Sequence, residues 1–85
     1  MHELSVASEI CRMAEEHLGG PGMRLLELGV EIGDDAGFEP ESLLFCLEAL
    51  LAEPPFSGAR PVLVRVPGDV LRLKYLEVDD GRADD

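Results

Sequence analysis

The fold is decided by the stretch Leu26-Glu27-Leu28-Gly29-Val30-Glu31-Ile32, in which aliphatic residues alternate with glutamates and a glycine. A period of two places the four aliphatic side chains on one face of a strand and the other residues on the opposite face. Gly33 and the acidic pair that follows it open a loop. We therefore predict a half-buried strand over residues 26–32.

Amphipathic helices are predicted on both sides of this strand. The segment from Leu4 to Leu18 repeats apolar residues at intervals of three and four, and a glycine-rich stretch around Pro21 ends it. Its apolar stripe consists of Ala7, Ile10, Cys11, Ala14 and Leu18. The second helix begins at Pro40, whose fixed φ and missing N–H suit the first helical position, and it stops at Pro54 and Pro55. Its stripe consists of Leu43, Leu44, Leu47, Leu50 and Leu51.

Two further extended runs follow the second helix. The first spans Pro61 to Val66 and the second spans Val70 to Val78. Between them, Pro67-Gly68 suits the central positions of a type II turn. We therefore predict an antiparallel hairpin closed by a tight turn at residues 66–69.

The last extended run changes phase along its length. Leu71 and Leu73 share one phase, whereas Leu76 and Val78 share the other. A slip of one residue is typical of a β-bulge, which returns the later apolar residues to the same face of the sheet. We predict this bulge near Lys74 and Tyr75.

The predicted order is helix, strand, helix, strand, strand, which makes the chain an α+β protein. Strands joined through a helix are expected to be parallel with a right-handed crossover, and the third strand is expected to run antiparallel to the second. Both helical stripes can be hidden only if the two helices cover one face of a three-stranded mixed sheet, as a two-layer sandwich. We expect a single domain over residues 1–79 and an acidic, flexible tail over residues 80–85.

Composition excludes several classes of function. The 85 residues include 7 Lys and Arg against 18 Asp and Glu, and the net charge of −11 disfavours nucleic acid and anionic membranes as partners. No apolar run approaches the roughly 20 residues of a membrane span. Because the start lacks the features of a signal peptide and the two cysteines show no CxxC spacing, we expect a cytoplasmic protein without structural zinc.

The sequence contains no strong catalytic motif. A phosphate-binding loop, GxGxxG after a strand, and HExxH are all missing from it. An enzyme that uses Asp34, Asp35 or Glu39 is disfavoured, because no set of nucleophile, base and oxyanion donors can be assembled around these residues. We expect a protein that is not an enzyme.

Three potential metal ligands have simpler structural roles. Cys11 and Cys46 lie on or beside the apolar stripes of the helices, where cysteine packs as a small hydrophobic residue. His17 lies near the end of the first helix, where an exposed histidine complements the last carbonyls. Redox or metal-binding duty for these residues is the less favoured interpretation.

His2 differs from these residues because of its neighbours. The Met1 amine, the amide and imidazole of His2, and the amide of Glu3 can all reach one ion. Four nitrogens in a plane suit Ni(II) and Cu(II), which prefer square or tetragonal nitrogen sites. A histidine at position two is a weak signal by itself.

Four segments, in order over most of the chain, carry a family resemblance. They are Met1-His2-Glu3-Leu4-Ser5-Val6-Ala7, Val30-Glu31-Ile32-Gly33, Pro40-Glu41-Ser42-Leu43 and Leu71-Arg72-Leu73-Lys74-Tyr75-Leu76-Glu77-Val78. These segments resemble the HypA/HybF family, the nickel-insertion accessory proteins of nickel–iron hydrogenase maturation. The resemblance implies Ni(II) ligands at Met1, His2 and Glu3. It also implies a partner, either a maturation GTPase of the HypB type or a hydrogenase large subunit.

The chain departs from that family at one place. Family members carry a zinc-binding domain with two CxxC pairs between the second and last strands, whereas here Val66-Pro67-Gly68-Asp69-Val70 closes the gap. This departure favours a reduced domain in which the turn at residues 66–69 replaces the zinc module. It also leaves an alternative open, a divergent HypA-like paralogue that acts as a metal-independent interaction module.

Overall fold

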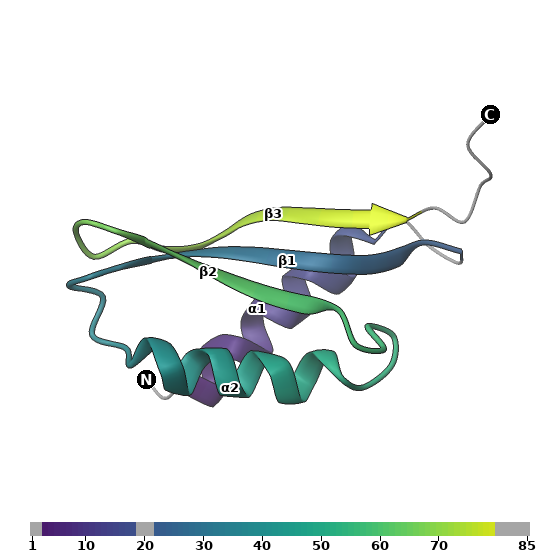
Figure 1. Ribbon diagram of the computed structural model, residues 1–85, viewed down its shortest axis with the longest axis horizontal. Coiled ribbons are helices and arrows are strands. Elements are labelled where there is room, and N and C mark those ends of the chain that lie inside the picture. The colour runs from purple at the N-terminus through teal and green to yellow at the C-terminus, as the bar shows by residue number, and fades with distance from the viewer. Residues whose placement is uncertain (1–2, 19–21, 80–85) are drawn as a thin grey trace.

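The computed structural model describes residues 3–18 and 22–79 and contains two helices and three strands (Figure 1). The elements are helix α1 (Glu3–His17), strand β1 (Arg24–Gly33), helix α2 (Pro40–Leu51), strand β2 (Arg60–Val66) and strand β3 (Leu71–Asp79). This order confirms the α-β-α-β-β prediction. The predicted tail at residues 80–85 lies outside the described residues.

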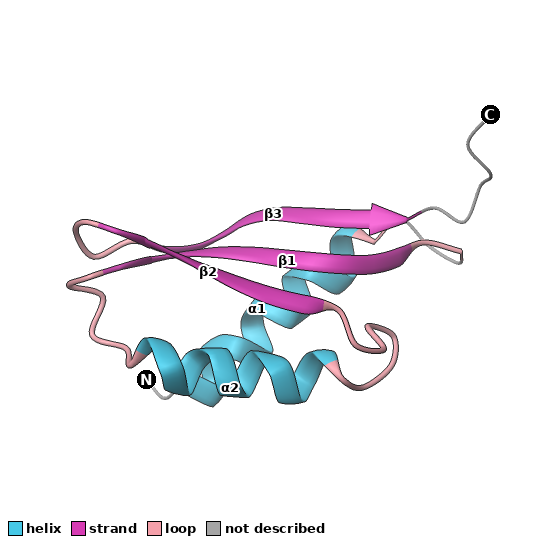
Figure 2. Cartoon of the chain, viewed as in Figure 1, coloured by secondary structure: helices cyan, strands magenta, loops and turns pink. Residues whose placement is uncertain are grey.

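Both helices lie on the same side of the sheet, so the protein is a two-layer α+β sandwich (Figure 2). Helix α2 contacts β2 and α1, and α1 also contacts β3. The buried core between the layers contains the stripes of both helices and the inner face of β1. Its most enclosed large side chains are Leu25, Leu28, Val30, Ile32, Leu43, Leu47 and Leu51.

Strand β1 is the centre of the sheet, whose order is β2-β1-β3. Strand β2 pairs with β1 in parallel, as predicted, and β3 pairs with β1 in antiparallel register. The predicted β2–β3 hairpin is therefore wrong, because β1 separates the two strands. Pro61 supplies the physical reason, since a residue without an N–H is suited to an edge strand and would break a ladder in the centre.

The connection from β2 to β3 crosses the end of β1. It is held there by three backbone hydrogen bonds, in which the N–H groups of Gly33, Asp34 and Asp35 donate to carbonyl oxygens of the crossing segment. Gly33 N lies 2.6 Å from Val70 O, and Asp35 N lies 2.8 Å from Gly68 O. A Cβ on Gly33 would lie 2.1 Å from the Gly68 carbonyl oxygen, so only glycine fits where the two segments cross.

Two bulges adjust which side chains of β1 and β3 face the helices. On β3, Tyr75 pairs with Gly29 and Leu73 with Val30, so Lys74 is the additional residue and the predicted bulge is confirmed. A second bulge at Leu26 was not predicted. It turns Leu26 outward, with 37% of its surface exposed, and buries Leu25 instead.

Candidate functional site

The predicted nickel site falls at the start of α1. Met1 and His2 lie outside the described residues, and Glu3 is the first residue of the helix. The structure therefore gives the surroundings of the site through Glu3 and the helix that carries it. Residues 3–17 form one continuous helix whose buried side anchors the segment to the core.

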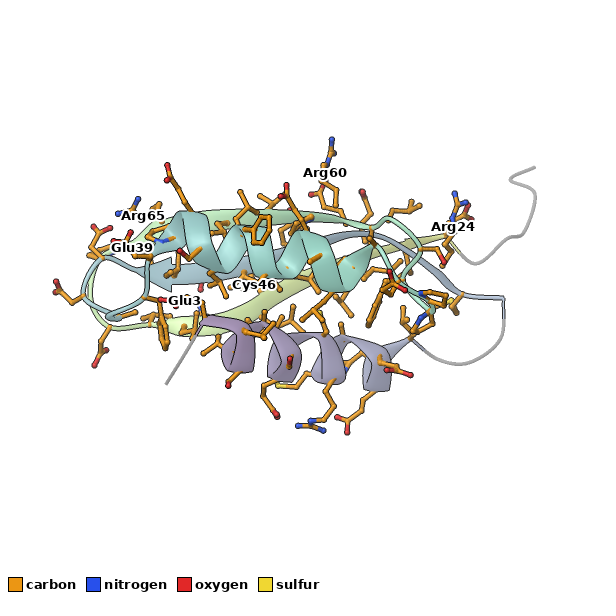
Figure 3. The ribbon with its side chains drawn as sticks, turned by 90° about the horizontal axis from the view of Figure 1, so that it is seen from below. Glu3, Arg24, Glu39, Cys46, Arg60 and Arg65 are labelled. Carbon is orange, nitrogen blue, oxygen red and sulfur yellow. The ribbon has the colours of Figure 1, made fainter. Side chains whose placement is uncertain are left out.

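The carboxylate of Glu3 joins the two helix starts. Its Oε2 atom accepts a hydrogen bond from the backbone N–H of Glu39, at 3.1 Å. Glu39 is the N-cap residue of α2 and makes no side-chain capping bond of its own. Figure 3 shows Glu3 and Glu39 at the same end of the molecule. The Glu3 side chain is thus part of the scaffold, which is compatible with the prediction that its backbone amide, not its carboxylate, is the metal ligand.

The other potential ligands lie apart from this end. Across residues 3–18 and 22–79, no group of three or more His, Cys, Asp or Glu side chains is arranged to hold a metal ion. His17 is exposed at the far end of α1, where its Nδ1 donates to the Met13 carbonyl at 3.0 Å. This confirms the helix-end role predicted for His17.

Both cysteines pack against the core, as predicted. Cys11 is buried on α1, and this burial raises the pKa of its thiol to about 11. Cys46 lies on α2 and is partly buried against the same cluster. A thiol held in its neutral form is a poor nucleophile and a poor metal ligand, so Cys11 serves packing.

The acidic loop after β1 has a structural role. Asp34 forms an ion pair with Arg65, with Oδ1 and Nη2 2.8 Å apart, and both side chains are more than half exposed. The backbone N–H groups of Asp34 and Asp35 hold the crossing segment in place. The loop therefore fixes the end of the sheet.

The outer face of the sheet contains a polar cluster that sequence reasoning missed. The ring of Tyr75 lies directly over Gly29, where a Cβ would lie 2.1 Å from Tyr75 Cε2. The Tyr75 hydroxyl donates to Glu27, and Arg60 Nη2 lies 2.7 Å from Glu27 Oε1. The hydrogen bond from Tyr75, assisted by Arg60, lowers the pKa of Glu27, and the same bond raises the pKa of Tyr75. A glycine within a strand was the available signal for this close approach.

Glu31 forms the second polar centre on that face. Arg72 Nε lies 2.5 Å from its Oε1, and Lys74 Nζ lies 3.7 Å from its Oε2. The hydrogen bond from Arg72 is the main reason that the pKa of Glu31 is lowered. The cluster lies on the side of the sheet away from the helices, so it supports the scaffold and not the metal end.

In the part of the chain that the structure describes, no helix has the length and apolar character needed to cross a lipid bilayer.

A family model matches residues 1–71, and its description is hydrogenase/urease nickel incorporation, metallochaperone, hypA. The match begins at the first residue and includes the predicted ligands. It ends at Leu71, the first residue of β3, so it leaves out residues 72–78 of the last segment that resembles the family.

Several curated proteins are similar to this chain. The hydrogenase maturation factor HypA of Geobacter metallireducens is 40% identical over 68 residues, which are 80% of this chain and 60% of that protein. The factor of the same name from Azotobacter vinelandii is 41% identical over 69 residues, with 80% and 61% of the two chains covered. The chain thus spans about 60% of the length of these relatives. No solved structure gives a significant match.

Proposed function

The chain belongs to the HypA family of hydrogenase and urease nickel-incorporation metallochaperones, and on that basis we propose that it binds Ni(II) at its N-terminus and transfers the ion to an acceptor protein. The ligands in this proposal are the Met1 amine, the amide and imidazole of His2, and the amide of Glu3. The family match that starts at residue 1 is the observation that carries the proposal.

The proposed chemistry is reversible coordination without bond cleavage. Binding expels protons from the ammonium group and from the amides, and Ni(II) is one of the few biological cations that can replace them. The site lies at the end of one helix, so few protein ligands have to be released during transfer. In this proposal the scaffold of α1, α2 and the sheet docks against the acceptor and presents the start of α1 to it.

The proposed acceptor is either a maturation GTPase of the HypB type or a hydrogenase large subunit, in the cytoplasm. We also propose that the crossing segment at residues 66–69 takes the place of the family's zinc module, so that no structural zinc is needed. The extent of the similarity supports this, since about two fifths of each curated relative has no counterpart in the match.

Nickel titration of protein that begins at Met1 tests the site. We expect one Ni(II) per chain with the visible absorption of diamagnetic square-planar nickel. His2→Ala and an extension of several residues before Met1 should each abolish this signal, because the first removes the imidazole ligand and the second moves the free amine out of reach of the ion. His17→Ala is the matched control and should bind as the wild type does. Stoichiometric binding that survives both changes at the N-terminus would disprove the proposed ligand set.

The same titration has an expected dependence on pH. Because protons leave the amine and the amides as nickel binds, the affinity should rise with pH and fall in acid. Isothermal calorimetry in buffers of different ionisation enthalpy measures the number of protons released. A release of no protons would show that the amides are not ligands.

A metal-independent interaction module is the alternative function. The observation in its favour is that the chain spans only about 60% of the length of its relatives, so the remaining part of those proteins has no counterpart in the match. Such a module would bind a maturation partner with the same affinity with and without nickel. A nickel-dependent change in that affinity would favour the metallochaperone instead.

A further inference from the structure

The two layers of the protein carry different shares of charge. The helices contain six carboxylates and one arginine, whereas the strands contain five basic side chains and four carboxylates. Every basic side chain of the strands lies within 4.0 Å of a carboxylate. On the helices, Arg12 pairs with both Glu9 and Glu16. The helical layer therefore presents an excess of negative charge to solvent.

Phe45 is exposed in this acidic layer. Solvent reaches 71% of its surface, whereas Leu47, two positions further along α2, is completely buried. Residues three and four positions away are the neighbours of a side chain on a helix surface. For Phe45 these exposed neighbours are Glu41, Ser42, Glu48 and Ala49. None of them is large and apolar, so the ring stays uncovered between two carboxylates.

This surface adjoins the proposed nickel end. The hydrogen bond from Glu39 N to Glu3 brings the starts of α1 and α2 together (Figure 3). Leu4, which follows Glu3, is also 55% exposed. Phe45 lies six residues after Glu39, or about 9 Å along the helix axis. A protein seated on Phe45 would therefore be close to a metal held at the start of α1.

We infer that the outward side of α2, formed by Glu41, Phe45 and Glu48, is the docking surface for a cationic protein acceptor that receives Phe45 in an apolar pocket. This inference rests on the proposed nickel transfer, for which it names the surface that positions the acceptor. Aromatic anchors surrounded by polar contacts are typical of the residues that dominate protein interfaces. A second copy of the chain is a poor occupant, because it presents the same negative charge and like charges repel.

The test measures the affinity of the chain for two purified probes, a HypB-type GTPase and a hydrogenase large-subunit precursor from the same organism. We expect one of them to bind the wild type, with Phe45→Ala weakening the affinity at least about tenfold. Leu26→Ala, which trims an exposed leucine on the sheet, is the matched control and should have no effect. Thermal unfolding should show that both variants remain folded.

The charge of the surface is tested in the same assay. The double variant Glu41→Gln/Glu48→Gln should slow association and reduce its dependence on salt. The matched control Asp69→Asn/Glu77→Gln removes the same number of charges outside the helices. It should change neither the association rate nor its dependence on salt. Binding that is insensitive to Phe45 and to the α2 carboxylates would overturn the inference. Failure of both probes to bind, or dimerisation of the chain through α2 in sedimentation, would also overturn it.

The nickel titration separates this inference from the proposed function. Phe45→Ala should still bind one Ni(II), because the ring is not a ligand. If the wild type binds nickel but docks without Phe45, only the docking surface is wrong. If the wild type docks through Phe45 but binds no nickel, the docking surface is supported and the chain is an interaction module. The metal-transfer proposal is then wrong.

Discussion

The two faces of β1 are held in place by different forces. The inner face packs its aliphatic side chains against both helices, and Leu28, Val30 and Ile32 are completely buried there. The outer face has two glutamates, each bonded to side chains of neighbouring strands. Burial of apolar surface is insensitive to pH and to moderate salt, whereas ion pairs and charged hydrogen bonds respond to both. Apolar packing therefore stabilises the inner face of β1, whereas ion pairs and charged hydrogen bonds stabilise its outer face.

The largest loss of stability should come from a substitution on the inner face of β1. Leu28→Ala removes a completely buried side chain and should cost about 2–5 kcal/mol of unfolding free energy, because a cavity remains. Leu26→Ala makes the same chemical change two residues earlier, where the bulge leaves the side chain 37% exposed. It should cost less than about 1 kcal/mol. Urea unfolding measures both, and equal costs would contradict the bulge.

The next largest loss of stability should come from the outer face, where the Tyr75 ring lies against Gly29. Gly29→Ala places a methyl group against the Tyr75 ring and should cost about 1–3 kcal/mol. Tyr75→Ser removes the ring, so the alanine should cost much less in that background. A double-mutant cycle gives the coupling, and strictly additive costs would show that the ring does not lie over Gly29.

The pH dependence of stability should come from the outer face as well. The pKa of Glu27 in the folded protein is lowered below its ordinary value of 4.5, first by the bond from Tyr75. Its contribution is therefore fully present above about pH 4.5 and is lost as the pH falls through the lower folded value. The advantage of the wild type over Glu27→Gln should shrink over that range. Tyr75→Phe should return the pKa of Glu27 toward 4.5 in an NMR titration, and an unchanged value would contradict the assignment.

The smallest expected difference is in the rate at which the two thiols react. Burial raises the pKa of Cys11 to about 11, so at pH 8 its thiol is protonated and enclosed. Cys46 is only partly buried. Ellman's reagent should therefore label one thiol quickly, and Cys46→Ser should remove that phase. A fast phase that persists in this variant would show that Cys11 is accessible.

The buried contacts on the inner face of β1 could be predicted from the sequence, whereas the polar contacts on its outer face could not. Periodicity identified both helical stripes and three of the four buried positions expected in β1, and the change of phase located the bulge at Lys74. These features depend on spacing along one segment. Strand order depends on pairing between segments, and the signal that could have corrected it, Pro61 as an edge-strand residue, was outweighed by the turn at Pro67-Gly68.

The metal end was predicted by resemblance and not by pattern. His2 is one residue, and its significance came from the segments that match a family. Two features at this end could not be predicted from spacing. The bond between Glu3 and Glu39 joins residues 36 positions apart, and the exposure of Phe45 depends on which side of α2 meets α1 and β2.

The crossing segment between β2 and β3 also defines an insertion point. Because β1 lies between the two strands, the ends of the connection are separated by two strand spacings, or about 10 Å. That gap suits a guest domain, since the termini of compact domains are often close together at the surface. A domain inserted after Gly68 would follow edge strand β2 and precede edge strand β3. The pairing of β1 with both strands would stay in register. We therefore expect a domain inserted at this point to leave the three-stranded sheet unchanged.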